Sequence, residues 1–267
     1  MAHVPITIVN LDRRPDRLAY MTDQLDALGL SWQRVSALDG KEVGPEGLDP
    51  RTLGNGPIPM THGSKAYAST MLKTFAAQEA EVMLYLQDDA DLSPDLATLL
   101  ANISWLPEEI GLVQLEKWPE RNGLKLLGPS LGTLPVPGRT LHRLYSRTGG
   151  AACFLIRKRA AHAIANVKHF VIPTDHMLFS PNTSPVFRDI GVGIVAPALA
   201  IQRREKIKSD MAAWRPRTTK LQHLRRAPSE VATVPMQVAA MLTGARWRDT
   251  RFEAITTPTK TLRRAET

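Results

Sequence analysis

Residue types that could do chemistry gather at residues 86–91 (LQDDAD), where three carboxylates directly follow the apolar run 82–86. Like charges this close repel each other unless a cation lies among them, and carboxylate oxygens are the ligands that Mg²⁺ or Mn²⁺ bound to a nucleotide diphosphate requires. The candidate metal ligands are Asp88, Asp89 and Asp91. Because side chains alternate along an extended chain, Asp89 and Asp91 are expected on one side and Asp88 on the other. A solvated acidic turn ahead of a helix that begins near Asp95 is the alternative interpretation.

A second polar segment, residues 10–17 (NLDRRPDR), follows the first predicted strand. It lies at the carboxyl end of that strand, which is where open α/β sheets bind ligands. Arg13 and Arg17 are four residues apart, so on a helix they share a face that can meet a phosphate. Charge pairing between the arginines and the neighbouring aspartates at a helix start is the plainer alternative.

A third candidate is Asp175, within residues 173–176 (PTDH). A carboxylate in such a loop can act as a general base. The alternative is a helix N-cap formed by Thr174 or Asp175. The histidines at positions 62, 142 and 223 have no metal-ligand spacing, so we interpret them as surface or core residues.

The elements that must position these groups alternate between strand and helix, which predicts an α/β fold with a central, mostly parallel sheet flanked by helices. Apolar patterns predict strands over 4–11, 31–37, 82–86, 111–115, 151–156 and 194–200. Helical spacing predicts helices over 14–28, 64–80, 95–103 and 159–167. Residues 123–139 are rich in glycine and proline, so we expect an exposed loop there.

Positive charge is concentrated near the end of the chain. Residues 203–267 hold 15 basic and 6 acidic residues, whereas residues 1–202 hold 19 and 20. The composition is that of a globular protein, with 43% hydrophobic and 22% charged residues. We therefore predict a folded domain over 1–212 and a basic, partly helical or disordered appendage over 213–267, in which 234–242 has a helical pattern. A neutral main body argues against a nucleic-acid-binding protein.

The single cysteine, Cys153, excludes an intrachain disulfide and a cysteine zinc site. It fits a reducing compartment. The first residues lack the pattern of a secretory signal, and the sequence contains no run of about 18 apolar residues. These observations predict a cytoplasmic protein that is either soluble or bound to a membrane only at its surface.

Several segments, in this order, resemble glycosyltransferase family 25, which includes bacterial lipooligosaccharide galactosyltransferases. The resemblance covers roughly residues 3–210. Its motifs are the strand 6–11 followed by Arg13 and Arg17, then 37–40 (ALDG), 86–89 (LQDD), 149–158, 173–175 (PTD) and the Pro197 to Gln202 spacing. Gln87 stands where the family has a glutamate, and the family's Ser-His pair before the acidic motif has no ungapped match.

The resemblance implies a GT-A-like nucleotide-sugar-binding fold, a UDP-sugar donor (UDP-galactose in the family), Mn²⁺ or Mg²⁺, and inversion at the anomeric carbon. The acceptor would be a glycan or a lipid-linked saccharide. The implied roles are metal binding for Asp88, Asp89 and, in reserve, Asp91; donor binding for Asn10, Arg13, Arg17, Asp39, Gly40 and Asp88; and general base for Asp175. The loop at 123–139 would then close over the acceptor.

Three rival functions remain. The first is a catalytically weakened relative that still binds a nucleotide sugar, and the second is a nucleic-acid-binding protein that uses the basic tail. The third is a metal-dependent phosphoesterase, although the sequence supplies no histidines close to the acidic cluster. For residues 203–267 we predict a peripheral contact with an anionic membrane, with 234–242 as its apolar part. A merely solvated tail is the alternative.

Overall fold

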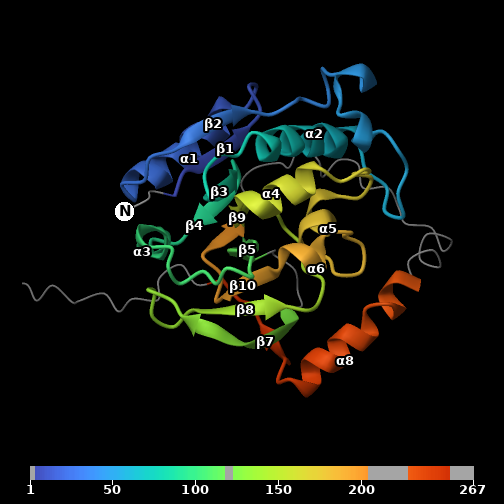
Figure 1. Ribbon diagram of the computed structural model, residues 1–267. Coiled ribbons are helices and arrows are strands. Elements are labelled where there is room, and N and C mark those ends of the chain that lie inside the picture. Colours follow the sequence, from blue (N-terminus) through green and yellow to red (C-terminus); the bar gives the residue numbers. More distant parts are fainter. Residues whose placement is uncertain (1–3, 118–122, 204–227, 253–267) are drawn as a thin grey trace, which may run out of the picture.

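The computed structural model describes residues 4–117, 123–203 and 228–252. Within them, nine strands form one sheet with the order β12-β7-β8-β10-β5-β9-β3-β1-β2 (Figure 1). These strands are β1 (Ile6–Asn10), β2 (Gln33–Ser36), β3 (Val82–Gln87), β5 (Leu112–Gln114), β7 (Leu124–Thr133), β8 (Thr140–Leu144), β9 (Cys153–Arg157), β10 (Val192–Ala196) and β12 (Arg246–Asp249). A second sheet has the order β4 (Ala90–Leu92), β11 (Ala200–Gln202) and β6 (Glu116–Lys117).

Helices cover both faces of the large sheet. α1 (Pro15–Ala27) and α3 (Asp95–Ala101) pack on one face, and α2 (His62–Ala76), α4 (Lys158–Ala165), α5 (Thr174–Phe179) and α6 (Phe187–Ile190) pack on the other. The apolar residues of β3 alternate between two core clusters, with Leu84 in one and Tyr85 in the other. The predicted α/β class, a large central sheet flanked by helices, is therefore confirmed.

The first strand–helix–strand unit follows directly from local sequence. Pro15 occupies the first turn of α1, where its missing N–H leaves no helical hydrogen bond unmade. Met21 and Leu25 lie four residues apart and are fully buried against the sheet. The helix ends before Gly29, which has a φ of 67°, a conformation that glycine adopts without strain. β2 then pairs in parallel with β1.

The sheet is mixed, which corrects the prediction that it is mostly parallel. Three neighbouring pairs are parallel and five are antiparallel. The parallel character is found where helices connect the strands, as in β2-β1-β3. The antiparallel pairs come from β9 and from the β7–β8 hairpin.

The predicted exposed loop at 123–139 is wrong, because residues 124–133 form β7. Leu126 and Leu127 are fully buried in this strand. The register of its pairing with β8 shifts on both sides of Ser130. The glycines of the strand and Pro129 are therefore accommodated at irregular positions of the ladder. A strand held between β8 and β12 cannot serve as the lid that we expected.

Part of the predicted appendage belongs to the main sheet. The helix expected at 234–242 is present as α8 (Val234–Leu242), and β12 after it is the edge strand beside β7. Residues 204–227 and 253–267, which carry much of the basic charge, lie outside the described residues, and the boundary near 212 stays a prediction. Within the part of the chain that the structure describes, no helix combines the length and apolar character needed to cross a bilayer.

Candidate active site

A pocket of about 370 Å³ opens where β1, β2 and β3 end. The strand order places β1 between β2 and β3, so the chain leaves β1 toward one side and returns on the other. Such a change of direction separates the loops at the carboxyl ends of the strands, and ligands of open α/β sheets bind in the resulting crevice. The lining comes from the end of β1 and the start of α1, from residues 37–41 after β2, from residues 61–63 at the start of α2, and from residues 87–89 after β3.

Asp88 is buried at the back of this pocket, with 6% of its surface exposed. The Asn10 side-chain amide donates a hydrogen bond to one of its oxygens at 2.7 Å, and Arg17 Nη1 lies 3.4 Å from the other. Burial raises the pKa of Asp88, although Asn10 and Arg17 both favour the charged form. The predicted donor-binding residue Asn10 thus supports Asp88 from behind rather than lining the pocket.

Asp89 lines the same pocket and is 7% exposed. Arg17 Nη1 lies 3.8 Å from its carboxylate, and Gln202 Nε2 donates to both oxygens at 3.2 and 3.1 Å. Its backbone carbonyl accepts a hydrogen bond from the Arg203 N–H at 2.8 Å. Burial raises the pKa of Asp89 to about 6, and the neighbouring charge of Asp88 adds to the shift.

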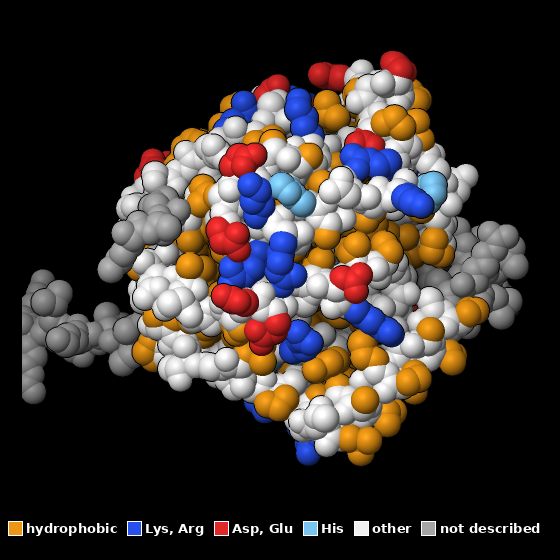
Figure 2. All heavy atoms as spheres, in the orientation of Figure 1, with side chains coloured by type: hydrophobic (Ala, Val, Ile, Leu, Met, Phe, Trp, Pro, Cys, Tyr) orange, Lys and Arg blue, Asp and Glu red, His pale blue; other side chains and the backbone are white. Residues whose placement is uncertain are grey.

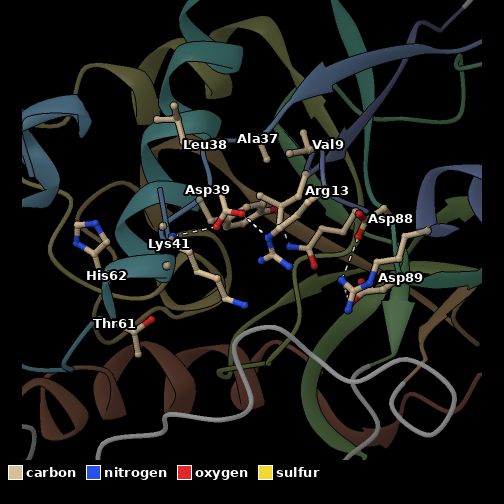
Figure 3. A pocket seen from close by; sticks show the side chains of 16 residues that line it. Val9, Arg13, Ala37, Leu38, Asp39, Lys41, Thr61, His62, Asp88 and Asp89 are labelled. Carbon is tan, nitrogen blue, oxygen red and sulfur yellow. Dashed lines mark hydrogen bonds and ion pairs between the residues drawn. The ribbon is translucent and has the colours of Figure 1, made fainter. Parts of the chain in front are cut away.

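Arg13 and Asp39 form an ion pair on the opposite side of the pocket. Figure 3 shows Asp39 on one side of Arg13 and the two acidic residues of the β3 end on the other. Burial raises the pKa of Asp39, but hydrogen bonds from Arg13 and from the Lys41 backbone outweigh it, and the net direction is downward. Gly40 follows directly, and a Cβ there would lie 2.6 Å from the Cα of Gly63, so glycine lets this loop contact α2.

Asp91 does not join the other two predicted metal ligands. It lies on β4, where Tyr20 donates a hydrogen bond to it and Arg203 Nε lies 3.4 Å away. The expected alternation is also wrong, because residues 88 and 89 form a turn and both side chains approach Arg17. In the described ranges, no group of three or more His, Cys, Asp or Glu residues is arranged to hold a metal ion.

Asp175 lies at the start of α5 and is not among the residues that line the pocket. Its Oδ1 accepts a hydrogen bond from the backbone N–H of His176 at 3.0 Å. The alternative interpretation of this segment as an N-cap is wrong, because Pro173 is the cap residue and no side chain caps the helix. The role of Asp175 as a base therefore stays a prediction.

Sequence reasoning missed a carboxylate in the second sheet, Glu116, which is 1% exposed. Its Oε2 accepts hydrogen bonds from the backbone N–H groups of Ala152 and Cys153, and among the described residues Oε1 has no partner. Burial raises its pKa to about 8, and the charges of Asp89 and Asp175 act in the same direction. Its place just after a predicted strand was a usable signal, since polar residues at strand ends meet at one edge of the sheet.

Two further groups line the pocket: Lys41, which sequence reasoning missed, and His62, which it interpreted as a surface or core residue. Lys41 and His62 line it beside Asp39, and His62 Nε2 lies 2.7 Å from the Val43 carbonyl oxygen. Gln87, the residue that replaces a glutamate in the resemblance, donates a hydrogen bond to the Tyr67 hydroxyl at 2.6 Å. The two cations on the pocket side of β1, Arg13 and Arg17, and Lys41 after β2 give the cavity positive as well as negative walls.

Comparison with known proteins finds distant structural similarity and no match in sequence. No family model matches the sequence, and no curated protein matches it. Among solved structures, a glycosyltransferase involved in the glycosylation of the major capsid of PBCV-1 covers 86% of this chain and 100% of its own, with a TM-score of 0.43 and 10% identity. Glucosyl-3-phosphoglycerate synthase from Mycobacterium tuberculosis, in complex with Mn²⁺, UDP and phosphoglyceric acid, covers 95% of this chain and 88% of its own, with a TM-score of 0.31 and 11% identity. Similarity at this level assigns neither a family nor an activity to the chain.

Proposed function

We propose that this chain is a glycosyltransferase that moves a hexose, with galactose as the first candidate, from a UDP-sugar to a glycan or lipooligosaccharide-type acceptor with inversion. The observation that carries the proposal is the buried Asp88–Asp89 pair beside Arg17, at the carboxyl end of β3 and next to the change of direction in the sheet. Such a site suits a ligand that brings both phosphate charge and hydroxyl groups.

The two walls of the pocket match the two halves of a nucleotide sugar. Val9, Ala37 and Leu38 provide apolar surface for a base, and Asp39 beside them can accept hydrogen bonds from a ribose or the uracil ring. Arg13, Arg17 and Lys41 provide the positive charge that a diphosphate needs. The donor would therefore lie across the end of β1, with its sugar toward the β3 end.

The residues present fit a divalent cation held jointly with a diphosphate. Mg²⁺-type sites commonly use one or two protein carboxylates together with substrate phosphate oxygens. Asp88 and Asp89 offer two, and burial raises the pKa of each carboxyl, so a cation beside them would stabilise their charged forms. When bound, the cation would supply neutralisation of the charge that develops on the leaving diphosphate.

The proposed reaction is a direct displacement at the anomeric carbon. The acceptor oxygen forms the new bond to that carbon, the bond to the diphosphate oxygen breaks, and a carboxylate accepts the acceptor's hydroxyl proton. Asp175 is our candidate for that base. Arg13 and Arg17 hold the diphosphate during the displacement. The configuration is inverted because the acceptor attacks the anomeric carbon on the face opposite to the leaving diphosphate.

The test is transfer from a panel of UDP-sugars with Mn²⁺, using Asp89→Ala and, as a matched control, Asp23→Ala on the exposed side of α1. We expect the first change to lower metal-dependent transfer about 100-fold or more, because it removes a charged contact made at the reacting diphosphate. The control should leave the rate unchanged. Normal transfer by Asp89→Ala would contradict the assignment.

A weakened relative that binds the donor without turning it over is the second candidate. The Gln87 amide favours it, since this side chain is a neutral ligand and is engaged with Tyr67. Calorimetric titration with UDP separates the two candidates. Tight binding of UDP without transfer or hydrolysis of any sugar in the panel would support the second one.

A lipid-linked acceptor would require the chain to work at the inner face of a membrane. The excess of basic residues in 203–267 supports such a place, because each Lys or Arg near an anionic surface contributes about 1 kcal/mol. We therefore keep a peripheral, cytoplasmic location as part of the proposal. The described residues near the end of the chain allow the surface that would contact the membrane to be defined.

A further inference from the structure

Large hydrophobic side chains that remain exposed are concentrated on α8 and the residues next to it. Nine such residues are found in the described part of the chain, and six of them lie between residues 231 and 247. We call this group the α8 surface, and its members are Val231, Val234, Val238, Met241, Leu242 and Trp247. Leu242 is 84% exposed and Trp247 is 55% exposed. Figure 2 shows hydrophobic side chains gathered over α8.

The α8 helix has the wrong composition for a helix that faces only water. No charged residue occurs from Val231 to Ala245. Ala240 is the one buried residue of the helix, and it packs with Leu126 and Ala245 against β7. The single long polar side chain, Gln237, points inward and donates to the Tyr145 carbonyl oxygen at 3.0 Å. The outer face is therefore apolar throughout, and exposed apolar faces of this kind mark contact sites.

Basic and aromatic side chains border this face. On β12, Arg246 and Arg248 flank Trp247, and all three are exposed. Arg246 donates hydrogen bonds to the Met241 and Ala245 carbonyl oxygens, which holds it beside the end of α8. Arginine and tryptophan next to an apolar helix are the residues that anchor proteins at the headgroup level of a bilayer.

The geometry points to an anionic lipid surface as the partner: we propose that the α8 surface inserts shallowly into the membrane while Arg246 and Arg248 bind lipid phosphates. Interfacial helices bury an apolar face about 5–10 Å deep and gain further from anionic headgroups. A second copy of the chain fits less well, since nine residues of helix span about 14 Å. That length is small for an interface of about 800 Å² per partner.

This inference deepens the proposed function, because a lipid-linked acceptor would be reached from the same surface, yet its test needs no donor. The full chain is sedimented with vesicles of phosphatidylcholine and phosphatidylglycerol in a 7:3 ratio, as a probe, and with vesicles of phosphatidylcholine alone. We expect binding to the anionic vesicles and at least about 10-fold weaker partition to the neutral ones, since each arginine near the surface contributes about 1 kcal/mol.

Two variants assign the binding to this surface. Leu242→Glu should lower partition about 10-fold or more, since it removes a leucine that would be buried in lipid. Leu53→Glu is the matched control, because Leu53 is a 42% exposed leucine outside the α8 surface, and it should bind like the parent chain. Arg246→Gln with Arg248→Gln should lower binding to anionic vesicles only. Circular dichroism of each variant checks that it folds.

Other outcomes separate the inference from its rivals. No sedimentation with anionic vesicles, or equal binding by Leu242→Glu and the parent chain, would overturn it. A dimer in analytical ultracentrifugation that Leu242→Glu abolishes, without any vesicle binding, would replace the lipid by a second copy. Asp89→Ala should still bind vesicles and Leu242→Glu should still bind UDP, so failure of UDP binding alone would reject the proposed function and leave the surface in place.

Discussion

Two buried arginines of this molecule meet carboxylates in opposite ways. The Arg139 side chain is fully buried and lies 2.9 Å from Asp95, 3.1 Å from Ser93 Oγ, and 2.9 and 2.6 Å from the carbonyl oxygens of Pro197 and Ala198. Arg17 lies beside two carboxylates, at 3.4 and 3.8 Å, and all three groups line a pocket. The first arrangement is closed within the protein, and the second one lines an open pocket.

The difference lies in charge balance. Near Arg139 one carboxylate faces one guanidinium, and Ser93 Oγ and two backbone carbonyl oxygens accept further hydrogen bonds from it. Near Arg17 two adjacent carboxylates share one nearby guanidinium, and burial raises the pKa of both. Carboxyl groups with a perturbed pKa in a pocket mark a candidate functional site, and the Asp88–Asp89 pair meets both conditions.

The largest expected effect tests the structural side of this comparison. Arg139→Ala should lower the free energy of unfolding by about 3–5 kcal/mol, because Asp95 is left as a buried carboxylate without its cation. Chemical denaturation at pH 7 measures the loss. The double change Arg139→Leu with Asp95→Leu should be much less harmful, since it removes both charges. Equal losses in the single and double variants would mean that packing rather than charge holds this region.

The next effect concerns the pH dependence of stability that arises from Asp89 in the pocket. The pKa of Asp89 is about 6 in the folded chain against an ordinary value of 3.8, so the folded state holds its proton more tightly than the unfolded state. The stabilisation of the folded state by this tighter proton binding is complete below about pH 4 and is lost as the pH rises through 6. Over that window it amounts to about 3 kcal/mol.

Asp89→Asn removes this titration, so its free energy of unfolding should fall less between pH 4 and pH 7 than that of the parent chain. Urea denaturation across the window gives both curves. The difference between them reports Asp89 together with its coupling to Glu116, because the charge of Asp89 contributes to the raised pKa of about 8 of that carboxyl. Parallel curves would show that Asp89 is not destabilised by burial.

A smaller effect is expected at Arg17 itself. Arg17→Met should lower the free energy of unfolding by about 1–2 kcal/mol at pH 7, less than the Arg139 change, because hydrogen bonds to charged groups are worth about 1.5–3 kcal/mol and the two acids can take up protons instead. UDP affinity should fall at least about 10-fold. A stability loss as large as that of Arg139→Ala would erase the distinction between the two regions.

Local sequence predicts part of this site and topology supplies the rest. Strand ends predicted at 11, 37 and 86 lie within one residue of the observed ends at 10, 36 and 87, and α8 was predicted at its observed bounds. Gln202 reaches Asp89 across 113 positions of sequence, through a β11 pairing that no local pattern reveals. The separation of Asp91 from the acidic pair depends on a two-residue turn after β3, whereas the alternation rule assumes an extended chain.

The last two strands at the β12 end of the large sheet were also not predicted. β7 and β12 are held by pairing with each other and with β8, so their stability comes from partners distant in sequence. The glycine and proline content of β7 led to the prediction of a loop there. Glu116 was missed for a related reason, since its environment is built by the backbone N–H groups of Cys153, the first residue of β9, and of Ala152 just before it.

The smallest stability effect is expected at a third ion pair, which is exposed but lines the pocket. It tests whether a residue can matter for ligand binding while contributing little to stability. Arg13 and Asp39 retain 30% and 11% of their side-chain exposure, so solvent screens the pair and Arg13→Gln should change the free energy of unfolding by less than about 1 kcal/mol. If the pocket binds a diphosphate, the same change should weaken UDP binding about 10-fold, because Arg13 lines the donor side. Calorimetric titration measures the affinity, and Arg51→Gln, which removes a similarly exposed cation paired with Asp49 outside the pocket, is the control. Unchanged UDP affinity in Arg13→Gln, with normal affinity in the control, would confine ligand binding to the Arg17 side of β1.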